Sequence, residues 1–141
     1  MFIVNVEGAI RKDDRWVIVE RSMKEEHAGG GLSLVGGKVE AENTPNILEK
    51  TLKREIAEEI GITVKDEMKY IHSITFTTDQ GIIVVNVIFL CEYESGELEV
   101  KEPDEVESIH LMSTEEIINH PKTPDYVKGY IQMAEKALSG V

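Results

Sequence analysis

The stretch "KREIAEEIGI", residues 53–62, places Glu55, Glu58 and Glu59 in what the sequence predicts to be the last two turns of a helix. At about 100° per residue, these side chains fall within an arc of roughly 100°. Like charges at these spacings destabilise an isolated helix by about 0.2–0.5 kcal/mol per pair. An apolar stripe borders the arc and consists of Leu48, Leu52, Ile56 and Ile60. The arc is therefore either a solvated acidic face or a set of ligands for a cation that offsets the repulsion.

The composition is that of an ordinary globular protein, with 41% hydrophobic and 30% charged residues in a chain of 141. A net charge of −12 disfavours nucleic acid and anionic membranes as partners, because both bind basic surfaces. A phosphate-bearing small molecule is still compatible if a divalent cation lies between acids and phosphates. The first residues lack a basic start followed by an apolar stretch, no apolar run reaches about 18 residues, and the single cysteine, Cys91, is expected to be a buried thiol. We therefore expect a cytoplasmic protein.

The hydrophobic pattern predicts one α/β domain over residues 1–141, with a mixed sheet and two or three helices. The expected strands are residues 2–10, 15–21, 69–78, 81–94 and 107–113. A glycine-rich loop with some extended backbone is expected between the second strand and the first helix. The expected helices are one that starts within residues 43–50, one at 113–120 and one at 123–138.

Helix-capping residues mark the ends of the first two expected helices. Asn43 or Thr44 is expected to cap the first helix, with Pro45 in its first turn. Gly61 is expected to end that helix. In the second helix, Ser113 or Thr114 followed by Glu116 predicts a capping box.

The paired glycines at 36–37 and the run "REIAEEIGI" at 54–62 form a more specific pattern. Together they resemble the signature of the Nudix hydrolases, the MutT-like enzymes, whose box ends in Arg-Glu-aliphatic-x-Glu-Glu-x-Gly-aliphatic. The residues that match this ending are Arg54, Glu55, Ile56, Glu58, Glu59, Gly61 and Ile62. The resemblance covers nearly the whole chain. It implies an α-β-α sandwich in which a mixed β-sheet is flanked by helices.

The resemblance also implies a magnesium site, with Mn²⁺ as an alternative metal. Glu55, Glu58 and Glu59 would be the ligands, helped by the backbone carbonyl of Gly36 or Gly37. Carboxylate and carbonyl oxygens are the hard ligands that Mg²⁺ prefers. In pyrophosphate hydrolysis the ion neutralises phosphate charge and lowers the pKa of a bound water.

Further residues complete the active site that the resemblance implies. Arg54 would orient a glutamate through a charge-assisted hydrogen bond. Arg21, Lys38 and Gly36 flank the site and are expected to bind substrate. The loop "KEPDEVE", residues 101–107, supplies Glu105 as the expected general base. The other acids of this loop are expected to be solvated surface: Glu102, Asp104 and Glu107.

The chain departs from the family pattern ahead of the Arg-Glu pair. The segment from Gly37 to Ile62 is three residues longer than usual, which indicates an insertion near "AENTPN", residues 41–46. The supporting first glutamate of the box is then absent or replaced by Glu42 or Glu49.

Two aromatic residues near the expected site are given ordinary interpretations. Trp16 alternates with its strand neighbours and is expected to be a packing residue rather than a platform for stacking a base. His27, beside the glycine loop, is expected to be a surface residue, with phosphate contact as the alternative.

The implied function is Mg²⁺-dependent hydrolysis of a pyrophosphate bond in a nucleoside diphosphate-linked substrate, either a nucleoside triphosphate or a nucleotide derivative. The alternative is a catalytically inactive nucleotide-binding or regulatory module of the same fold. A small nucleotide is the expected partner of a monomer or homodimer, without nucleic acid or membrane. ADP-ribose-type members tend to have a proline after the box, but this chain has none between Pro45 and Pro103.

Overall fold

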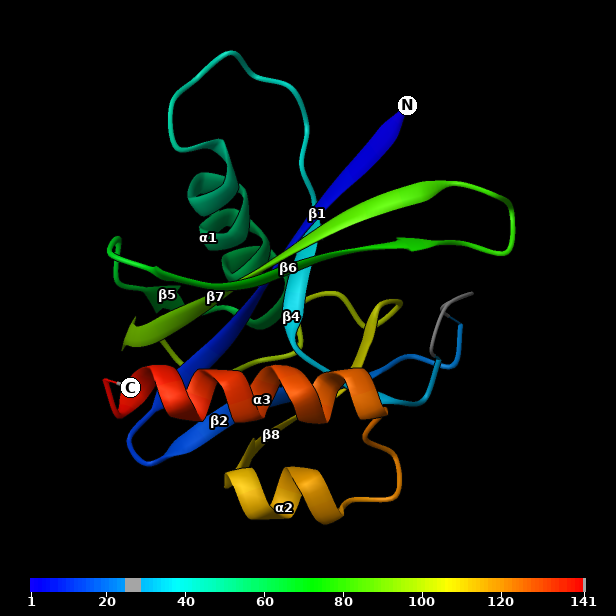
Figure 1. Ribbon diagram of the computed structural model, residues 1–141. Helices are drawn as coiled ribbons and strands as arrows, with labels where there is room; N and C mark the ends of the chain where they lie inside the picture. Colours follow the sequence, from blue (N-terminus) through cyan, green and yellow to red (C-terminus); the bar gives the residue numbers. More distant parts are fainter. Residues whose placement is uncertain (25–28, 141) are drawn as a thin grey trace.

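The computed structural model of the protein describes residues 1–24 and 29–140, so His27 lies outside the described residues. Its strands are β1 Phe2–Lys12, β2 Arg15–Arg21, β3 Leu32–Ser33, β4 Val35–Lys38, β5 Thr63–Val64, β6 Lys69–Thr77, β7 Ile83–Ser95 and β8 Val106–Met112. Its helices are α1 Ile47–Ile60, α2 Thr114–Asn119 and α3 Asp125–Leu138. The predicted mixed sheet flanked by helices is confirmed (Figure 1). None of the described helices is long and apolar enough to cross a membrane.

The other strands of the sheet are arranged around β1. Along one edge, β1 pairs in parallel with β7 from Phe2 to Arg11. Along its other edge it pairs antiparallel with β4 and then with β2. Because β3 pairs with β2, the chain crosses from β2 to β1 between β3 and β4. This crossing places Gly36 and Gly37 where β1 and β2 separate.

Side chains of β1 alternate between two hydrophobic cores, one on each face of the sheet. Val6 and Ile10 belong to the core that α1 covers. Ala9 belongs to the second core, which α2 and α3 close with Ile117 and Ile131. In Figure 1, α2 and α3 lie together and apart from α1. The molecule therefore has a helical layer on each side of the sheet.

The apolar stripe of α1 is buried as expected, but the helix begins later than the sequence predicts. It starts at Ile47, after Asn46, whose φ of 57° is left-handed and whose side chain caps nothing. Asn43 is also left-handed, with φ 51°, so the segment before the helix is a turn. The predicted caps at Asn43 or Thr44, and Pro45 in the first turn, are therefore wrong. Asparagine tolerates this conformation better than most residues, which allows the turn to continue through position 46.

The C-terminal end of α1 is as predicted. Gly61 adopts φ 76° and its N–H donates to the carbonyl of Ala57 at 3.1 Å. Leu52, Ile56 and Ile60 are completely buried. Burying each such side chain contributes about 1.5–3 kcal/mol, which fixes the rotation of the helix about its axis and hence the direction of its acidic arc.

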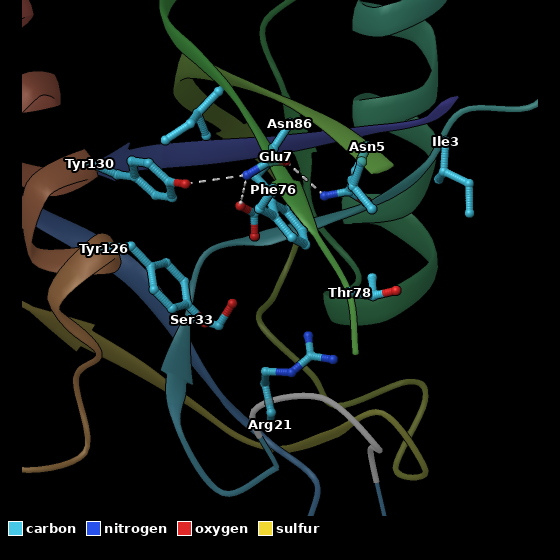
Figure 2. Close-up of a pocket in the computed structure, with 12 residues that line it drawn as sticks. Ile3, Asn5, Glu7, Arg21, Ser33, Phe76, Thr78, Asn86, Tyr126 and Tyr130 are labelled. Carbon is cyan, nitrogen blue, oxygen red and sulfur yellow. Dashed lines mark hydrogen bonds between the residues drawn. The ribbon is translucent and has the colours of Figure 1, made fainter. Parts of the chain in front are cut away.

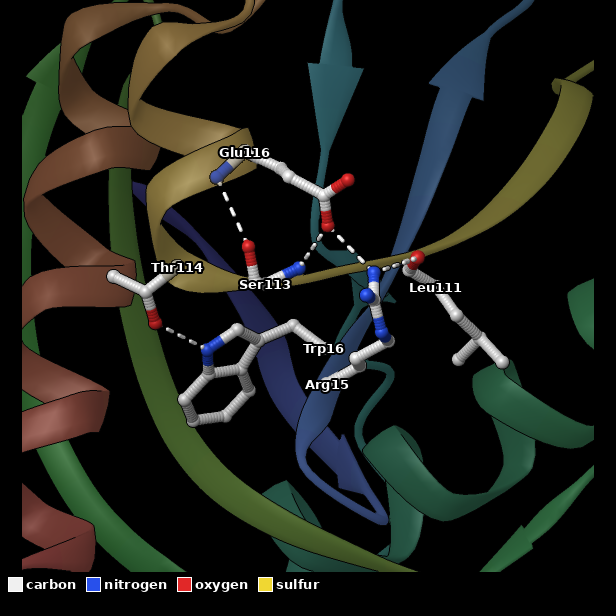
Figure 3. Close-up of polar contacts among 6 residues, drawn as sticks. All are labelled: Arg15, Trp16, Leu111, Ser113, Thr114 and Glu116. Atoms are coloured by element: carbon white, nitrogen blue, oxygen red, sulfur yellow. Dashed lines mark hydrogen bonds and ion pairs between the residues drawn. The ribbon is translucent and has the colours of Figure 1, made fainter.

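Trp16 is a packing residue, as the sequence predicts. It is completely buried in the core beneath α2 and α3. Its indole N–H donates to the Thr114 hydroxyl at 2.9 Å (Figure 3). That hydroxyl donates to Glu135 at 2.8 Å. A single chain of hydrogen bonds therefore joins β2, α2 and α3.

The predicted capping box forms at the start of α2 with Ser113 as its cap. The Ser113 hydroxyl accepts from the Glu116 N–H at 3.1 Å, and the Glu116 carboxylate accepts from the Ser113 N–H at 2.8 Å (Figure 3). The backbone N–H of Ser113 is the main cause that lowers the pKa of Glu116, and Arg15 lowers it further. Through Arg15, which pairs with Glu116 and donates to the Leu111 carbonyl, the box connects this short helix to β2 and β8.

Replacing Ser113 by alanine removes half of the capping box. We expect Ser113→Ala to lower the free energy of unfolding by about 1 kcal/mol, the usual effect of losing such a cap. Chemical denaturation followed by circular dichroism measures the change. Ser95→Ala, at the exposed end of β7, is the matched control and should stay within about 0.5 kcal/mol of the parent. Equal losses in both variants would contradict a specific role for the cap.

Candidate active site

The backbone of β4 lies directly against the carboxyl group of Glu55 on α1. A Cβ atom built on Gly37 would lie 2.4 Å from Glu55 Cδ and 2.7 Å from its Oε1. A Cβ atom on Gly36 would lie 2.0 Å from the carbonyl oxygen of Val6 on β1. Both distances are far below van der Waals contact, so glycine is required at each position. Gly37 admits the carboxyl group, whereas Gly36 admits the neighbouring strand.

Arg54 holds two of the box glutamates by charge. Its Nη1 lies 3.3 Å from Glu55 Oε1 and 3.3 Å from Glu58 Oε2. Burial lowers the pKa of Arg54, but the charges of Glu55, Glu58 and Glu42 outweigh it and raise that pKa. Whether Glu42 or Glu49 replaces the first glutamate of the box, or none does, stays a prediction; of the two, Glu42 is the one whose charge acts on Arg54. It lies in the loop between β4 and α1, where the predicted insertion falls (Figure 1).

Glu59 is the most constrained acid of the site. It is 7% exposed, and among the described residues its buried Oε2 has no hydrogen-bond partner. Burial, and then the charges of Glu105 and Glu55, raise the pKa of Glu59 to about 9, although Arg21 opposes this shift. A buried carboxylate beside like charges is unfavourable unless a cation balances it.

The carboxylate oxygens of the box glutamates fit a hard divalent cation by chemistry. Glu55 lies against the main chain of β4, and Glu59 has an oxygen without a partner. Glu58 is paired with Arg54 instead. In the described part of the chain, no three or more histidine, cysteine, aspartate or glutamate side chains are arranged so that they could hold a metal ion as they stand. The ligand set inferred from the sequence stays a prediction.

The acidic loop before β8 brings Glu105 to the same place. The Ser22 N–H donates to the Glu105 carbonyl at 2.9 Å, and the Lys101 N–H donates to the Glu59 carbonyl at 3.0 Å. The loop is therefore tied by its backbone to both β2 and α1. Charges of Glu105 and Glu102 both act on Glu59. Glu102, expected to be solvated surface, is half-buried, and its role stays a prediction.

A pocket of about 530 Å³ lies on the opposite face of the sheet from α1 (Figure 2). Glu7 and Asn86 lie on its floor, while Phe76 of β6 and Tyr126 of α3 form apolar walls. Arg21 points toward it from the other end. No local signal in the sequence marks Glu7 or Asn86, because each lies in an ordinary strand pattern.

Arg21 connects the pocket with the acidic site. Its charge lowers the pKa of Glu7, and it also lowers the pKa of Glu59. Lys38 is exposed at the end of β4, opposite Asn5, and does not line the pocket. Of the two basic residues expected to bind substrate, the structure brings Arg21 to both regions.

Comparison with known proteins identifies the family of the chain. Residues 1–133 match the family model described as the NUDIX domain. Comparison with curated proteins gives no match.

Solved structures share the fold. A MutT NUDIX hydrolase from Burkholderia pseudomallei is 24% identical with a TM-score of 0.78, covering 94% of this chain and 98% of that chain. The MutT protein from Methanosarcina mazei Go1 is 20% identical with a TM-score of 0.78, covering 97% and 95%. The NUDIX domain of Shewanella oneidensis NrtR, complexed with ADP ribose, is 16% identical with a TM-score of 0.73, covering 98% and 88%.

The two glycines allow a prediction that separates the active site from the fold. We expect Gly37→Ala to push the Glu55 carboxyl group aside, because the end of a flexible side chain gives way more easily than backbone. Pyrophosphohydrolase activity should then fall at least about tenfold while Tm changes by only a few degrees. Gly36→Ala should instead lower Tm strongly, because it disrupts the pairing of β4 with β1.

Scanning calorimetry and nucleotide turnover measured on both variants provide the comparison. Full activity in Gly37→Ala would contradict the role given to the contact with Glu55.

Proposed function

Because the chain belongs to the Nudix family, we propose that it is a Mg²⁺-dependent hydrolase of a pyrophosphate bond in a nucleoside diphosphate-linked substrate. The substrate is a nucleoside triphosphate or a nucleotide derivative. The observation that carries the proposal is Glu59, a buried acid with an oxygen that has no hydrogen-bond partner among the described residues and whose pKa the charges of Glu55, Glu102 and Glu105 raise further. Such a cluster needs a cation before polyanionic phosphates can approach it.

The proposed metal ligands are the carboxylates of Glu55, Glu58 and Glu59 and the carbonyl of Gly37. When bound, Mg²⁺ neutralises phosphate charge and makes a coordinated water more acidic. Glu55 is held in place by the close approach of β4, and the apolar stripe of α1 fixes the helix that carries all three acids. Mn²⁺, which also accepts oxygen ligands, could replace Mg²⁺.

Proton transfer and charge balance are assigned to residues around this cluster. Glu105 is the proposed general base, because its charge raises the pKa of Glu55 and of Glu59 and its carbonyl accepts a hydrogen bond from the Ser22 N–H. It accepts the proton of the attacking water. Arg54 orients Glu55 and Glu58 through its ion pairs with both.

The nucleoside is proposed to lie in the 530 Å³ pocket, with its phosphates directed toward the acidic cluster. Arg21 acts on acids of both regions and is the proposed phosphate contact, and Gly36 is proposed to bind substrate through its backbone. Lys38, on the exposed end of β4, is a secondary candidate for the same role. NrtR shows that one protein of this fold binds ADP ribose. The missing proline after the box disfavours ADP ribose as the substrate here.

The proposal treats residues 1–141 as one catalytic domain that acts in the cytoplasm as a monomer or homodimer. The competing proposal is an inactive nucleotide-binding or regulatory module. The complete acidic set on α1 favours the enzyme, since simple binding of a nucleotide does not require several acids that repel one another.

Turnover of a nucleotide panel tests the proposed reaction. We expect the purified protein with Mg²⁺ to release phosphate or pyrophosphate from at least one nucleoside triphosphate or nucleoside diphosphate derivative. Glu58→Gln and Glu59→Gln should each lower kcat/KM at least about 100-fold, because each removes a charged ligand. Glu92→Gln, which breaks only a surface ion pair with Lys65, is the matched control. Binding of nucleotides without turnover would support the inactive module, and turnover that survived both substitutions would refute the metal assignment.

Mg²⁺ binding can also be measured without catalysis. A ligand that binds only the folded state stabilises it by about 2.7 kcal/mol when present at 100 times its Kd. We therefore expect Mg²⁺ to raise the Tm of the parent by several degrees. The rise should be smaller in Glu59→Gln and unchanged in Glu92→Gln. An equal rise in all three proteins would place the ion elsewhere.

A further inference from the structure

The floor of the pocket holds a hydrogen-bond chain with a fixed direction. Asn5 Nδ2 donates to Asn86 Oδ1 at 2.9 Å, and Asn86 Nδ2 donates to Glu7 Oε1 at 2.8 Å. Asn86 Nδ2 also lies 3.5 Å from the Tyr130 hydroxyl. Because Asn86 is only 3% exposed and its oxygen already accepts from Asn5, its amide nitrogen must face Glu7.

This chain makes Glu7 a positioned acceptor in the pocket. One carboxylate oxygen is oriented by Asn86, and Glu7 itself is partly exposed, toward the pocket that it lines. Burial raises the pKa of Glu7, while the hydrogen bond from Asn86 and the charge of Arg21 lower it. The net shift of the Glu7 pKa is upward, and Asn86 and Arg21 limit it by favouring the ionised form. Figure 2 shows the Glu7 carboxyl group beside Asn86, in the pocket that Phe76 and Tyr126 also line.

We propose that Glu7, positioned by Asn86, selects the nucleobase, and that the selected base presents two adjacent N–H donors on one edge, as guanine does. The inference rests on the proposed function, because it assumes that a nucleotide occupies this pocket. Neither residue belongs to the box signature, and the two are 79 positions apart in the chain.

The choice of base follows from donor and acceptor patterns. Guanine presents N1–H and N2–H₂ side by side, so an ionised carboxylate accepts from both. Inosine keeps N1–H but lacks the exocyclic amino group. Adenine and cytosine place a ring-nitrogen lone pair beside their amino group, and that lone pair would face a carboxylate oxygen. Uracil has one N–H between two carbonyl oxygens. A site built around a positioned acceptor rejects partners that lack the matching donor.

Base preference is measured by equilibrium binding of the α,β-methylene analogues of GTP, ITP and ATP with Mg²⁺, because these resist cleavage between the α- and β-phosphates. We expect the guanine analogue to bind about tenfold more tightly than the inosine analogue and about 100-fold more tightly than the adenine analogue, at about tenfold per lost favourable contact. Turnover of GTP, ITP and ATP should follow the same order in kcat/KM. Equal affinities for guanine and adenine in the parent protein would overturn the inference without requiring any variant.

Glu7→Gln provides the residue-specific test. The new amide oxygen can keep the hydrogen bond from Asn86, while its NH₂ group replaces the second carboxylate oxygen. A donor would then face the donors of guanine but the ring-nitrogen acceptor of adenine. The guanine-to-adenine affinity ratio should fall at least tenfold, whereas Glu92→Gln should keep the parent ratio. An unchanged ratio in a Glu7→Gln protein with the parent Tm would overturn the assignment.

The two readouts separate this inference from the proposed function. Guanine-selective binding that depends on Glu7, without turnover of any nucleotide, would remove the hydrolase and leave the base selection. Turnover without base preference would leave the hydrolase and remove the role of Glu7.

Discussion

The backbone of β4 lies so close to the carboxyl group of Glu55 that no side chain fits between them. This contact requires the chain to cross from β2 to β1 between β3 and β4, at the place where β1 and β2 separate. It also requires α1 to present one fixed face to the sheet, which the burial of Leu52, Ile56 and Ile60 ensures. The split sheet and the anchored helix thus position one acid from two directions.

Charge is distributed unevenly around this contact. Burial raises the pKa of Glu59, and the charges of Glu105, Glu55 and Glu102 raise it further. Arg54 offsets the repulsion on the outer side of the helix, and Arg21 does so on the side toward the pocket. These cations leave the buried end of Glu59 unbalanced. The protein stores an unfavourable arrangement there, as active sites commonly do.

The sequence alone predicts those parts of the structure that depend on interactions between residues close in the chain. The last turns of α1, its final glycine and the capping box of α2 follow from spacing along the chain. The start of α1 could not be predicted in the same way. Asn43 and Asn46 adopt a left-handed backbone, and no spacing along the chain marks that conformation. The pocket floor was also hidden. Glu7 and Asn86 meet only because β1 and β7 pair in parallel, and neither strand marks its partner in sequence.

Side chains of β1 alternate in direction, so its two faces contact different parts of the molecule. Asn5 and Glu7 face the pocket, while Val6 and Gly8 face α1. Substitutions on one face can therefore alter ligand recognition without touching the helix on the other. Insertion or deletion of one residue would exchange the two sets, burying a carboxyl group against α1 and turning core valines into the pocket. Evolution can therefore change the pocket side chains of this strand one at a time, whereas the length of the strand is restricted.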